Sequence, residues 1–163
     1  MVSKQNQIQI PLLIWRRLVA DLSARGAGSR ETGAFLMGIK GDEGRSVVRY
    51  LCYDDLDRRA LTHGIVEFHR GGFSKLWDVC REGGLQVLAD VHTHPTRDVR
   101  QSSIDKANPM LPVRGHVALI LPKYGRSSKW SLAPAGIYRF AGGGQWETFH
   151  PDAAYCPVKL SLW

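Results

Sequence analysis

The chain has 163 residues, of which 44% are hydrophobic and 23% are charged, and its formal net charge is +7. A chain of this length buries a proper core in one domain and is too short for two comfortable domains. It contains no apolar run near the roughly 18 residues that a membrane helix needs, and its polar start, residues 1–10, does not follow the pattern of a secretory signal.

Local sequence patterns predict alternating strands and helices with strands in the majority. The signals are apolar spacing, runs of β-branched residues, and breaks at glycine or proline. In the first half they predict a helix over residues 11–25, hairpin strands over 32–39 and 46–53, and a charged loop over 54–59. An extended segment over 62–68 and a helix over 73–82 follow. The second half predicts a strand over 85–94, a short helix over 102–108, strands over 116–121, within 130–140 and over 145–149, and an irregular tail from 151. We therefore expect an α+β fold, with a mixed β-sheet flanked by helices.

The stretch from His92 to Asp105 concentrates the polar chemistry of the chain. His92 and His94 stand at positions i and i+2 at the end of a predicted strand, so both imidazoles project from the same face. Asp105 follows after a turn forced by Pro95 and can supply an oxygen ligand. Two histidines and one carboxylate are a common ligand set for catalytic zinc, which keeps a fourth position for water. The stretch therefore predicts a hydrolase that needs no protein nucleophile.

Each part of this stretch also has a simpler interpretation. An isolated pair of histidines is usually without a metal, and the segment from Ser102 to Asp105 is by itself an ordinary helix N-terminus with serine as the N-cap. The combination H-x-H-P-x6-S-x-x-D fixes several residue types at set spacings, which rarely occurs by chance. The other histidines lack ligand spacing to this stretch and are interpreted as structural or surface residues: His63, His69, His116 and His150.

The complete pattern resembles the motif of the JAMM metalloproteases, also called the MPN+ or JAB family. In that family an upstream glutamate precedes H-[ST]-H-P-x6-S-x-x-D, and every position of the downstream motif is matched here. Glu31 opens the segment ETGAFLMG, which is similar to the family's E-x-G-G-x-L-x-G with Ala34 in place of the second glycine. The order of predicted elements also matches. The resemblance implies a cytidine-deaminase-like JAB/MPN fold in one domain, residues 1–163, with its core over about residues 8–150, nearest to the prokaryotic JAB branch.

The resemblance also implies a role for each residue of the motif. His92, His94 and Asp105 would bind one Zn²⁺ per chain, with water as the fourth ligand. Glu31 would be the general base that takes a proton from this water and delivers it to the leaving amine. Ser102 would donate a hydrogen bond to the developing oxyanion. These roles agree with general chemistry, because zinc acidifies water and polarises a carbonyl, a carboxylate moves protons, and a hydroxyl stabilises negative charge.

Members of this family most often cleave the amide between a ubiquitin-like C-terminus and a lysine. The resemblance therefore implies an isopeptidase that removes or processes a ubiquitin-like protein. Three bacterial roles remain open: deconjugation in an antiphage operon with E1-like and E2-like proteins, release of a sulfur-carrier protein, and action beside phage-tail enzymes. The first is favoured because the chain is a stand-alone JAB domain. A RadC-like role linked to nucleic acid is the alternative, and a non-catalytic MPN scaffold is disfavoured because no ligand residue is lost.

Positive charge is concentrated after the histidine pair. Residues 95–130 hold seven basic residues but only two acidic ones, Asp98 and Asp105. This excess favours an acidic partner near the site, either a protein face or a nucleic acid, and the alternative is a solvated basic surface. Nucleic acid is disfavoured because the chain lacks a recognisable helix-turn-helix.

The cysteines predict the redox environment. Cys52, Cys80 and Cys156 are widely spaced and form no C-x-x-C pair. We therefore expect reduced thiols, neither disulfides nor zinc ligands, and a cytoplasmic protein without a membrane partner.

Overall fold

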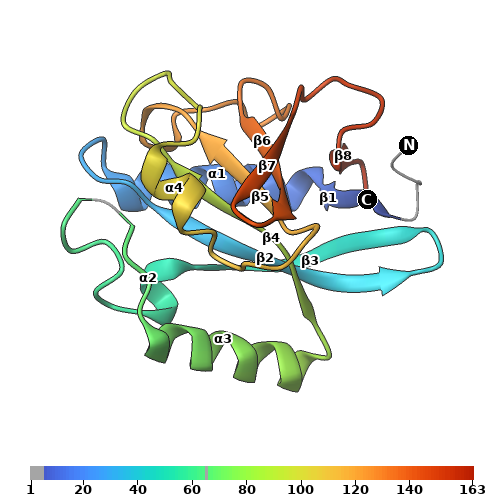
Figure 1. Cartoon of the computed structure of the whole chain (residues 1–163), viewed down its shortest axis with the longest axis horizontal. Coiled ribbons are helices and arrows are strands. Elements are labelled where there is room, and N and C mark those ends of the chain that lie inside the picture. Colours follow the sequence, from blue (N-terminus) through green and yellow to red (C-terminus); the bar gives the residue numbers. More distant parts are fainter. Residues whose placement is uncertain (1–5, 65) are drawn as a thin grey trace.

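The computed structural model describes residues 6–64 and 66–163. Its strands are β1 (Ile8–Pro11), β2 (Gly33–Gly41), β3 (Gly44–Cys52), β4 (Gln86–Thr93), β5 (Val117–Leu121), β6 (Gly136–Gly142), β7 (Gln145–Phe149) and β8 (Val158–Ser161). Its helices are α1 (Leu12–Gly26), α2 (Tyr53–Leu56), α3 (Arg70–Gly83), α4 (Ser103–Ala107) and the 3₁₀ turn η2 (Lys123–Gly125). The strands form one mixed sheet of eight in the order β7-β6-β5-β4-β2-β3-β1-β8 (Figure 1). The expected α+β domain is confirmed.

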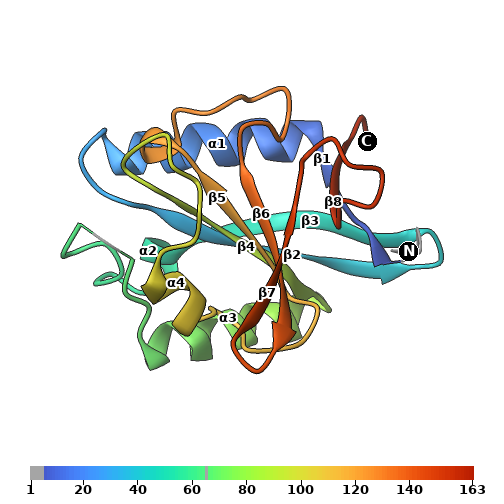
Figure 2. The same ribbon diagram turned by 45° about the horizontal axis from the view of Figure 1, so that its top comes forward.

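Helices cover both faces of the sheet, as Figure 2 shows with α1 above and α3 below. Alternate residues of β2 point to opposite faces, and over residues 34–37 both sets are fully buried. Ala34 and Leu36 join the core under α1, whereas Phe35 and Met37 pack with Leu76 of α3. A central strand that is apolar on both sides results from this double cover. β4, the neighbour of β2, therefore provides a rigid platform for its last residues.

The connection from β4 to β5 determines where the motif residues meet. β4 pairs with β2 antiparallel and with β5 in parallel, with His92 opposite Gly33 on one side and Ile120 on the other. Two parallel strands need a crossover connection, because the chain must return to the end of the sheet at which the first strand began. This crossover contains α4 and passes over the end of β4. Asp105 of α4 is thereby returned to the histidines.

The last two strands on one side of the sheet, β1 and β8, were not predicted, and the expected irregular tail was wrong. β1 and β8 pair in parallel with Ile8 opposite Val158, and both side chains are fully buried. Each strand has only four residues and depends on a partner distant in the sequence. Such short segments carry no periodicity of their own, so the pairing was not visible in the sequence.

Two other segments differ from the expectation. The expected loop over 54–59 begins with helix α2, where acidic Asp54 and Asp55 in the first turn suit the positive end of the helix dipole. Arg25 of α1 holds both carboxylates at 2.9 Å. The segment 62–68 was expected to be extended, but its described part consists of turns and coil, and residue 65 lies outside the described residues.

The cysteines agree with the expectation of free thiols. Cys52, Cys80 and Cys156 are all buried and free. In the described residues, no helix has the length and apolar character to cross a membrane.

Candidate metal centre

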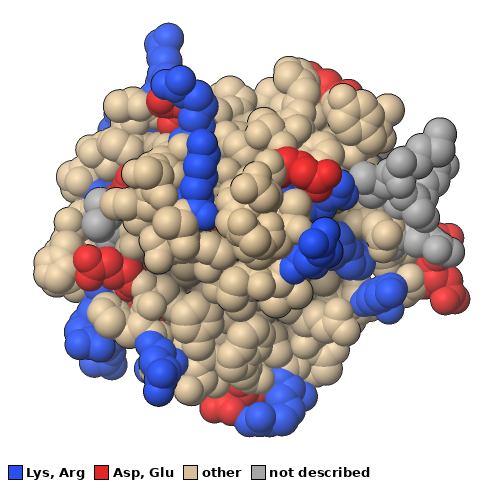
Figure 3. Space-filling model, viewed as in Figure 1, with Lys and Arg blue, Asp and Glu red and all other residues tan. Residues whose placement is uncertain are grey.

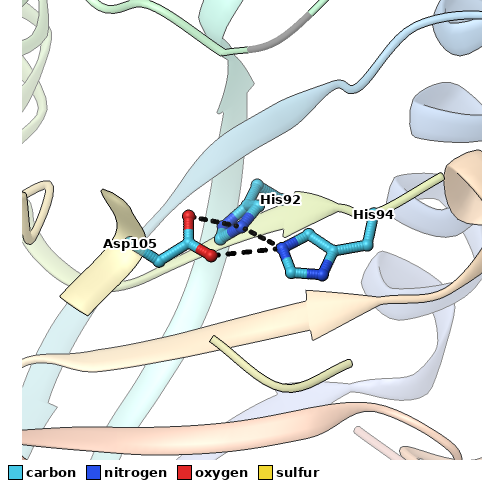
Figure 4. A group of neighbouring side chains, drawn as sticks. All are labelled: His92, His94 and Asp105. Atoms are coloured by element: carbon cyan, nitrogen blue, oxygen red, sulfur yellow. Dashed lines mark hydrogen bonds and ion pairs between the residues drawn. The ribbon is translucent and has the colours of Figure 1, made fainter. Parts of the chain in front are cut away.

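Three side chains converge at the end of β4 (Figure 4). The Nε2 atoms of His92 and His94 lie 3.2 Å apart, and His94 Nε2 lies 3.2 Å from Asp105 Oδ2. His92 Nε2 lies 3.4 Å from Asp105 Oδ1. Their side chains are 13%, 13% and 21% exposed, so the group is shielded but open to solvent on one side. The sequence-predicted ligand set is therefore brought together.

This triangle has the dimensions of one face of a zinc tetrahedron. With zinc–ligand bonds of about 2.0–2.1 Å, neighbouring ligand atoms of a tetrahedron lie about 3.3–3.4 Å apart. The three measured edges, 3.2, 3.2 and 3.4 Å, are close to this value. Two imidazoles and one carboxylate also match the ligand chemistry of zinc sites that leave one position open. The residues therefore fit a divalent zinc ion.

The remaining polar atoms of His94 are fixed by the main chain. Its Nδ1 lies 3.0 Å from the carbonyl oxygen of Asp98, an arrangement in which Nδ1–H donates and Nε2 is left free as a ligand. Its own N–H donates to Leu121 of β5, and its carbonyl accepts from Tyr124 of η2, both at 2.8 Å. The ring is therefore oriented before any ion is bound.

Asp105 is held by a complete capping box at the start of α4. The Ser102 hydroxyl accepts a hydrogen bond from the Asp105 N–H at 3.1 Å, and both the N–H and the hydroxyl of Ser102 donate to Asp105 Oδ2 at 2.7 Å. Burial alone would raise the pKa of Asp105, but His92, His94 and Ser102 hold it well below its ordinary value. Asp105 is therefore a carboxylate ready to bind a cation.

The crossover that carries Asp105 is fastened to the neighbouring strands at both ends. Before α4, the hydroxyl of Tyr138 on β6 donates to the carbonyl oxygen of Val99 at 2.6 Å. In α4, the Lys106 carbonyl accepts a hydrogen bond from the indole of Trp146 on β7 at 3.1 Å. These contacts fix the path of the chain between His94 and Asp105, and no local sequence pattern announces them.

Glu31 is placed beside the triangle by two threonines. The N–H of Thr32 donates to the Thr93 hydroxyl, and the N–H of Thr93 donates to the Thr32 carbonyl, both at 2.9 Å. These bonds fasten the start of β2 to the end of β4, so Glu31 comes next to His92. The carboxyl group is half-buried; burial raises its pKa, while His92 and His94 act in the opposite direction. The sequence identified Glu31, but it did not identify the threonine pair that positions it.

The comparisons with known proteins agree with this geometry. Residues 14–133 match the family model described as prokaryotic homologs of the JAB domain. The chain belongs to this family. Its fold is similar to that of a protein from Desulfitobacterium hafniense, with a TM-score of 0.55 and 17% identity, covering 95% of this chain and 93% of that one. A protein from Salinibacter ruber gives a TM-score of 0.58 and 17% identity, covering 93% of this chain and 95% of that one.

The departure of this JAB domain from the glycine pattern of the family lies away from the metal centre. Ala34, which replaces the second glycine, is fully buried in the core under α1, on the other face of β2. Gly33, by contrast, leaves no room for a side chain, because an added Cβ would lie 2.2 Å from the Tyr53 ring and 2.7 Å from the carbonyl oxygen of Val91. The glycine that is retained is therefore the one that the site requires.

A loop of this JAB domain between α2 and α3 holds Glu31 from the side opposite β4. The Glu31 N–H donates to the carbonyl oxygen of Gly64 at 2.9 Å, and its carboxylate accepts a hydrogen bond from the Val66 N–H. Asp57 and His69 join the two ends of this loop. The Asp57 carboxylate accepts a hydrogen bond from the His69 N–H at 2.9 Å and also contacts the His69 ring. No sequence pattern indicates this support, because the loop carries no motif.

Replacing Asp57 by alanine is expected to lower the free energy of unfolding at pH 7 by about 2 kcal/mol, because the N–H groups of Arg59 and His69 lose their acceptor. Burial alone would raise the pKa of Asp57, but these hydrogen bonds bring it below its ordinary value. Asp57 therefore stabilises the fold above about pH 4, its unfolded pKa, and this contribution disappears as the pH falls through the folded pKa.

Urea denaturation of the Asp57→Ala variant and the unchanged chain across this pH range checks the expectation. The difference in unfolding free energy should be full at pH 7 and shrink below about pH 4. Glu82→Ala removes an exposed carboxylate from α3 and should change little at any pH. A difference for Asp57→Ala that stayed constant on acidification would contradict the assignment.

The other histidines have structural or surface positions, as expected. His63 and His150 are exposed, His69 pairs with Asp57, and His116 pairs with Asp90. The last pair is buried: His116 Nε2 lies 2.5 Å from Asp90 Oδ1, and the Tyr53 hydroxyl donates to Asp90 Oδ2 at 3.3 Å. Asp90 precedes His92 by two residues, so both side chains leave β4 on the same face.

The basic residues after Pro95 do not form one surface. Arg100 pairs with Asp98 in the loop before α4. Arg126 lies beside Gly28 at the end of α1, and Arg114 lines a groove at the starting end of β4. On the face drawn in Figure 3, the Lys and Arg side chains of the chain as a whole lie in several separate groups. Only part of the predicted basic segment therefore borders the metal centre.

Proposed function

We propose that this JAB domain is a zinc-dependent isopeptidase or peptidase that cleaves the C-terminal amide of a ubiquitin-like protein. The observation that carries the proposal is the triangle of His92, His94 and Asp105 with the half-buried Glu31 beside it. Membership of the JAB family and the complete motif support a metallohydrolase. A zinc ion bound there would polarise a scissile carbonyl and lower the pKa of water toward about 7.

Glu31 has the surroundings that a general base needs. Its pKa is raised by burial, which brings a carboxyl group nearer to the range in which it can both take and return a proton. The hydrogen bonds at Gly64 and Val66 hold its main chain and its carboxylate from one side. We infer that Glu31 takes the proton of the attacking water and delivers it to the leaving amine.

Ser102 has two roles to reconcile. Its hydroxyl donates to Asp105 Oδ2 at 2.7 Å and so supports a metal ligand. A hydroxyl at this position can also turn to donate to an oxyanion, and its own N–H continues to hold Asp105 at 2.7 Å when it does. We propose that Ser102 stabilises the oxyanion during the reaction and Asp105 between turnovers.

The proposed substrate follows from the family, whose members most often act on ubiquitin-like C-termini. We propose a bacterial antiphage conjugation system as the setting, with E1-like and E2-like proteins as partners. Processing of a sulfur-carrier protein and a RadC-like role are the alternatives. All three roles would use the same metal centre, so only the identity of the substrate distinguishes them. Neighbouring genes for an E1-like, an E2-like and a ubiquitin-like protein would support the first.

Metal analysis and a cleavage assay test the proposal together. The purified chain is expected to hold one zinc ion. It is also expected to release a reporter that is fused by an amide to the C-terminal glycine of a ubiquitin-like protein encoded by a neighbouring gene. A chelator should stop cleavage and added zinc should restore it. The His94→Ala variant should lack both zinc and activity. Absence of zinc would overturn the metal centre, whereas zinc without cleavage would overturn only the proposed substrate.

A further inference from the structure

A second concave region lies at the opposite end of β4 from the metal centre. It is a groove of about 700 Å³ between the β2–β3 hairpin, the chain before β5, and β6 and β7. Gln86 at the start of β4 lines it, whereas His92 lies near the end of that strand. At about 3.3 Å per residue, the two positions are about 20 Å apart. The groove is therefore separate from the proposed catalytic site.

The groove is strongly basic. Among the described residues that line it, Glu147 is the only acidic one and four are cationic: Lys40, Arg45, Arg114 and Arg139. Glu147 is already paired, since it accepts a hydrogen bond from Arg139 Nε at 2.7 Å. Figure 3 shows basic side chains gathered between β7 and the β2–β3 hairpin. Three positive charges of the groove therefore lack a partner carboxylate within its lining.

The surroundings of Arg45 disfavour its positive charge. Burial lowers its pKa, and the neighbouring Arg139 lowers it further. One terminal nitrogen donates to the Asn6 carbonyl at 2.6 Å, while its Nε is buried and has no hydrogen-bond partner among the residues that the structure describes. A half-buried guanidinium with a second cation nearby is stabilised when an anion binds to it.

The remaining lining is mainly apolar, together with the amides of Asn6 and Gln86 and the imidazole of His116. Val87, Leu111, Val113 and Phe140 form apolar walls. The volume of about 700 Å³ lies within the range of sites for small molecules, about 300–1,000 Å³. A carboxylate would neutralise only one of the three unpaired cations, whereas a phosphate group carries up to two charges and accepts several guanidinium hydrogen bonds.

We propose that this groove binds the phosphate of a nucleotide, with the phosphate on Arg45 and Arg114 and the base against the apolar wall. Two sources supply this chemistry, a free mononucleotide and the backbone of a single strand. The volume of about 700 Å³ is that of a small-molecule site and favours the free mononucleotide. The site does not depend on the proposed peptidase activity, because none of its residues belongs to the metal centre.

Calorimetric titration of the full chain with adenosine monophosphate tests the proposal. Saturable binding is expected, with Arg45→Gln and Arg114→Gln each weakening it about tenfold or more. Glu147→Gln removes the only acid of the groove and should preserve or tighten binding. Arg81→Gln makes the same charge change on exposed α3 and should alter affinity less than twofold. If Arg45→Gln fails to fold, the binding affinity of the Arg114→Gln variant, which changes an exposed residue, decides the result.

Further titrations separate the sources and exclude the metal centre. Inorganic phosphate should bind more weakly than adenosine monophosphate if the base contacts the apolar wall. A short single-stranded oligonucleotide that binds more tightly than the mononucleotide would identify a strand as the source of the phosphate. The proposal is overturned if none of these probes saturates, if Arg81→Gln weakens binding as much as Arg114→Gln, or if His92→Ala abolishes binding.

Discussion

Replacing Glu31 by glutamine is expected to leave the zinc content near one ion per chain and to lower kcat by about 10²–10⁴-fold. Glutamine keeps the shape of the side chain and can still accept the hydrogen bond from Val66. It cannot take a proton, so the step that depends on the base is lost. The metal ligands His92, His94 and Asp105 are unchanged, and metal binding should be unaffected. Zinc analysis and the cleavage assay on the same preparation measure both quantities.

A matched control is available in the loop that holds the base. Glu67→Gln makes the same chemical change on an exposed carboxylate, which pairs with His63 among the residues that the structure describes. This variant should keep both zinc and activity. Loss of zinc in Glu31→Gln would show that Glu31 is a ligand or a structural support, and full activity would remove it from the proton transfer. Either result would leave the triangle of ligands intact and would change only the assignment of the base.

The convergence of His92, His94 and Asp105 could be predicted from the sequence because their geometry is largely local. The spacing of His92 and His94 on one strand fixes their common face, and the capping pattern of Ser102 places Asp105 at the first turn of a helix. These relations depend on strand and helix geometry alone. Glu31 was found differently, through its resemblance to the motif of a family.

The supports of the site could not be predicted, because each of them joins segments that are distant in the chain. Thr32 and Thr93 bind each other across two strands, and the Asp57–His69 pair closes a loop without a motif. The sequence of the tail that forms β8 has no strand pattern of its own, and the strand depends on pairing with β1. Sequence patterns report local preference, whereas these contacts arise only when the sheet has formed.

Replacing Gly33 by alanine is expected to lower the free energy of unfolding by about 3 kcal/mol and the affinity for zinc by about 10–100-fold. An added Cβ would lie 2.2 Å from the ring of Tyr53 and 2.7 Å from the carbonyl oxygen of Val91. Tyr53 is fully buried, and the carbonyl belongs to β4 itself, so neither can move aside freely. β2 must shift away from β4 at the residue that pairs with His92.

The effect at Gly33 should be specific to its position. Gly71 lies on the exposed face of α3, where an added Cβ meets nothing within 4 Å. Gly71→Ala should therefore leave zinc affinity unchanged and stabilise the helix by up to about 1 kcal/mol. Thermal denaturation and competition for zinc with a chromogenic chelator measure the two quantities for both variants. If Gly33→Ala lost stability but kept its zinc affinity, the geometry of His92 would not depend on the close approach of β2, and the threonine pair alone would hold the two strands in register.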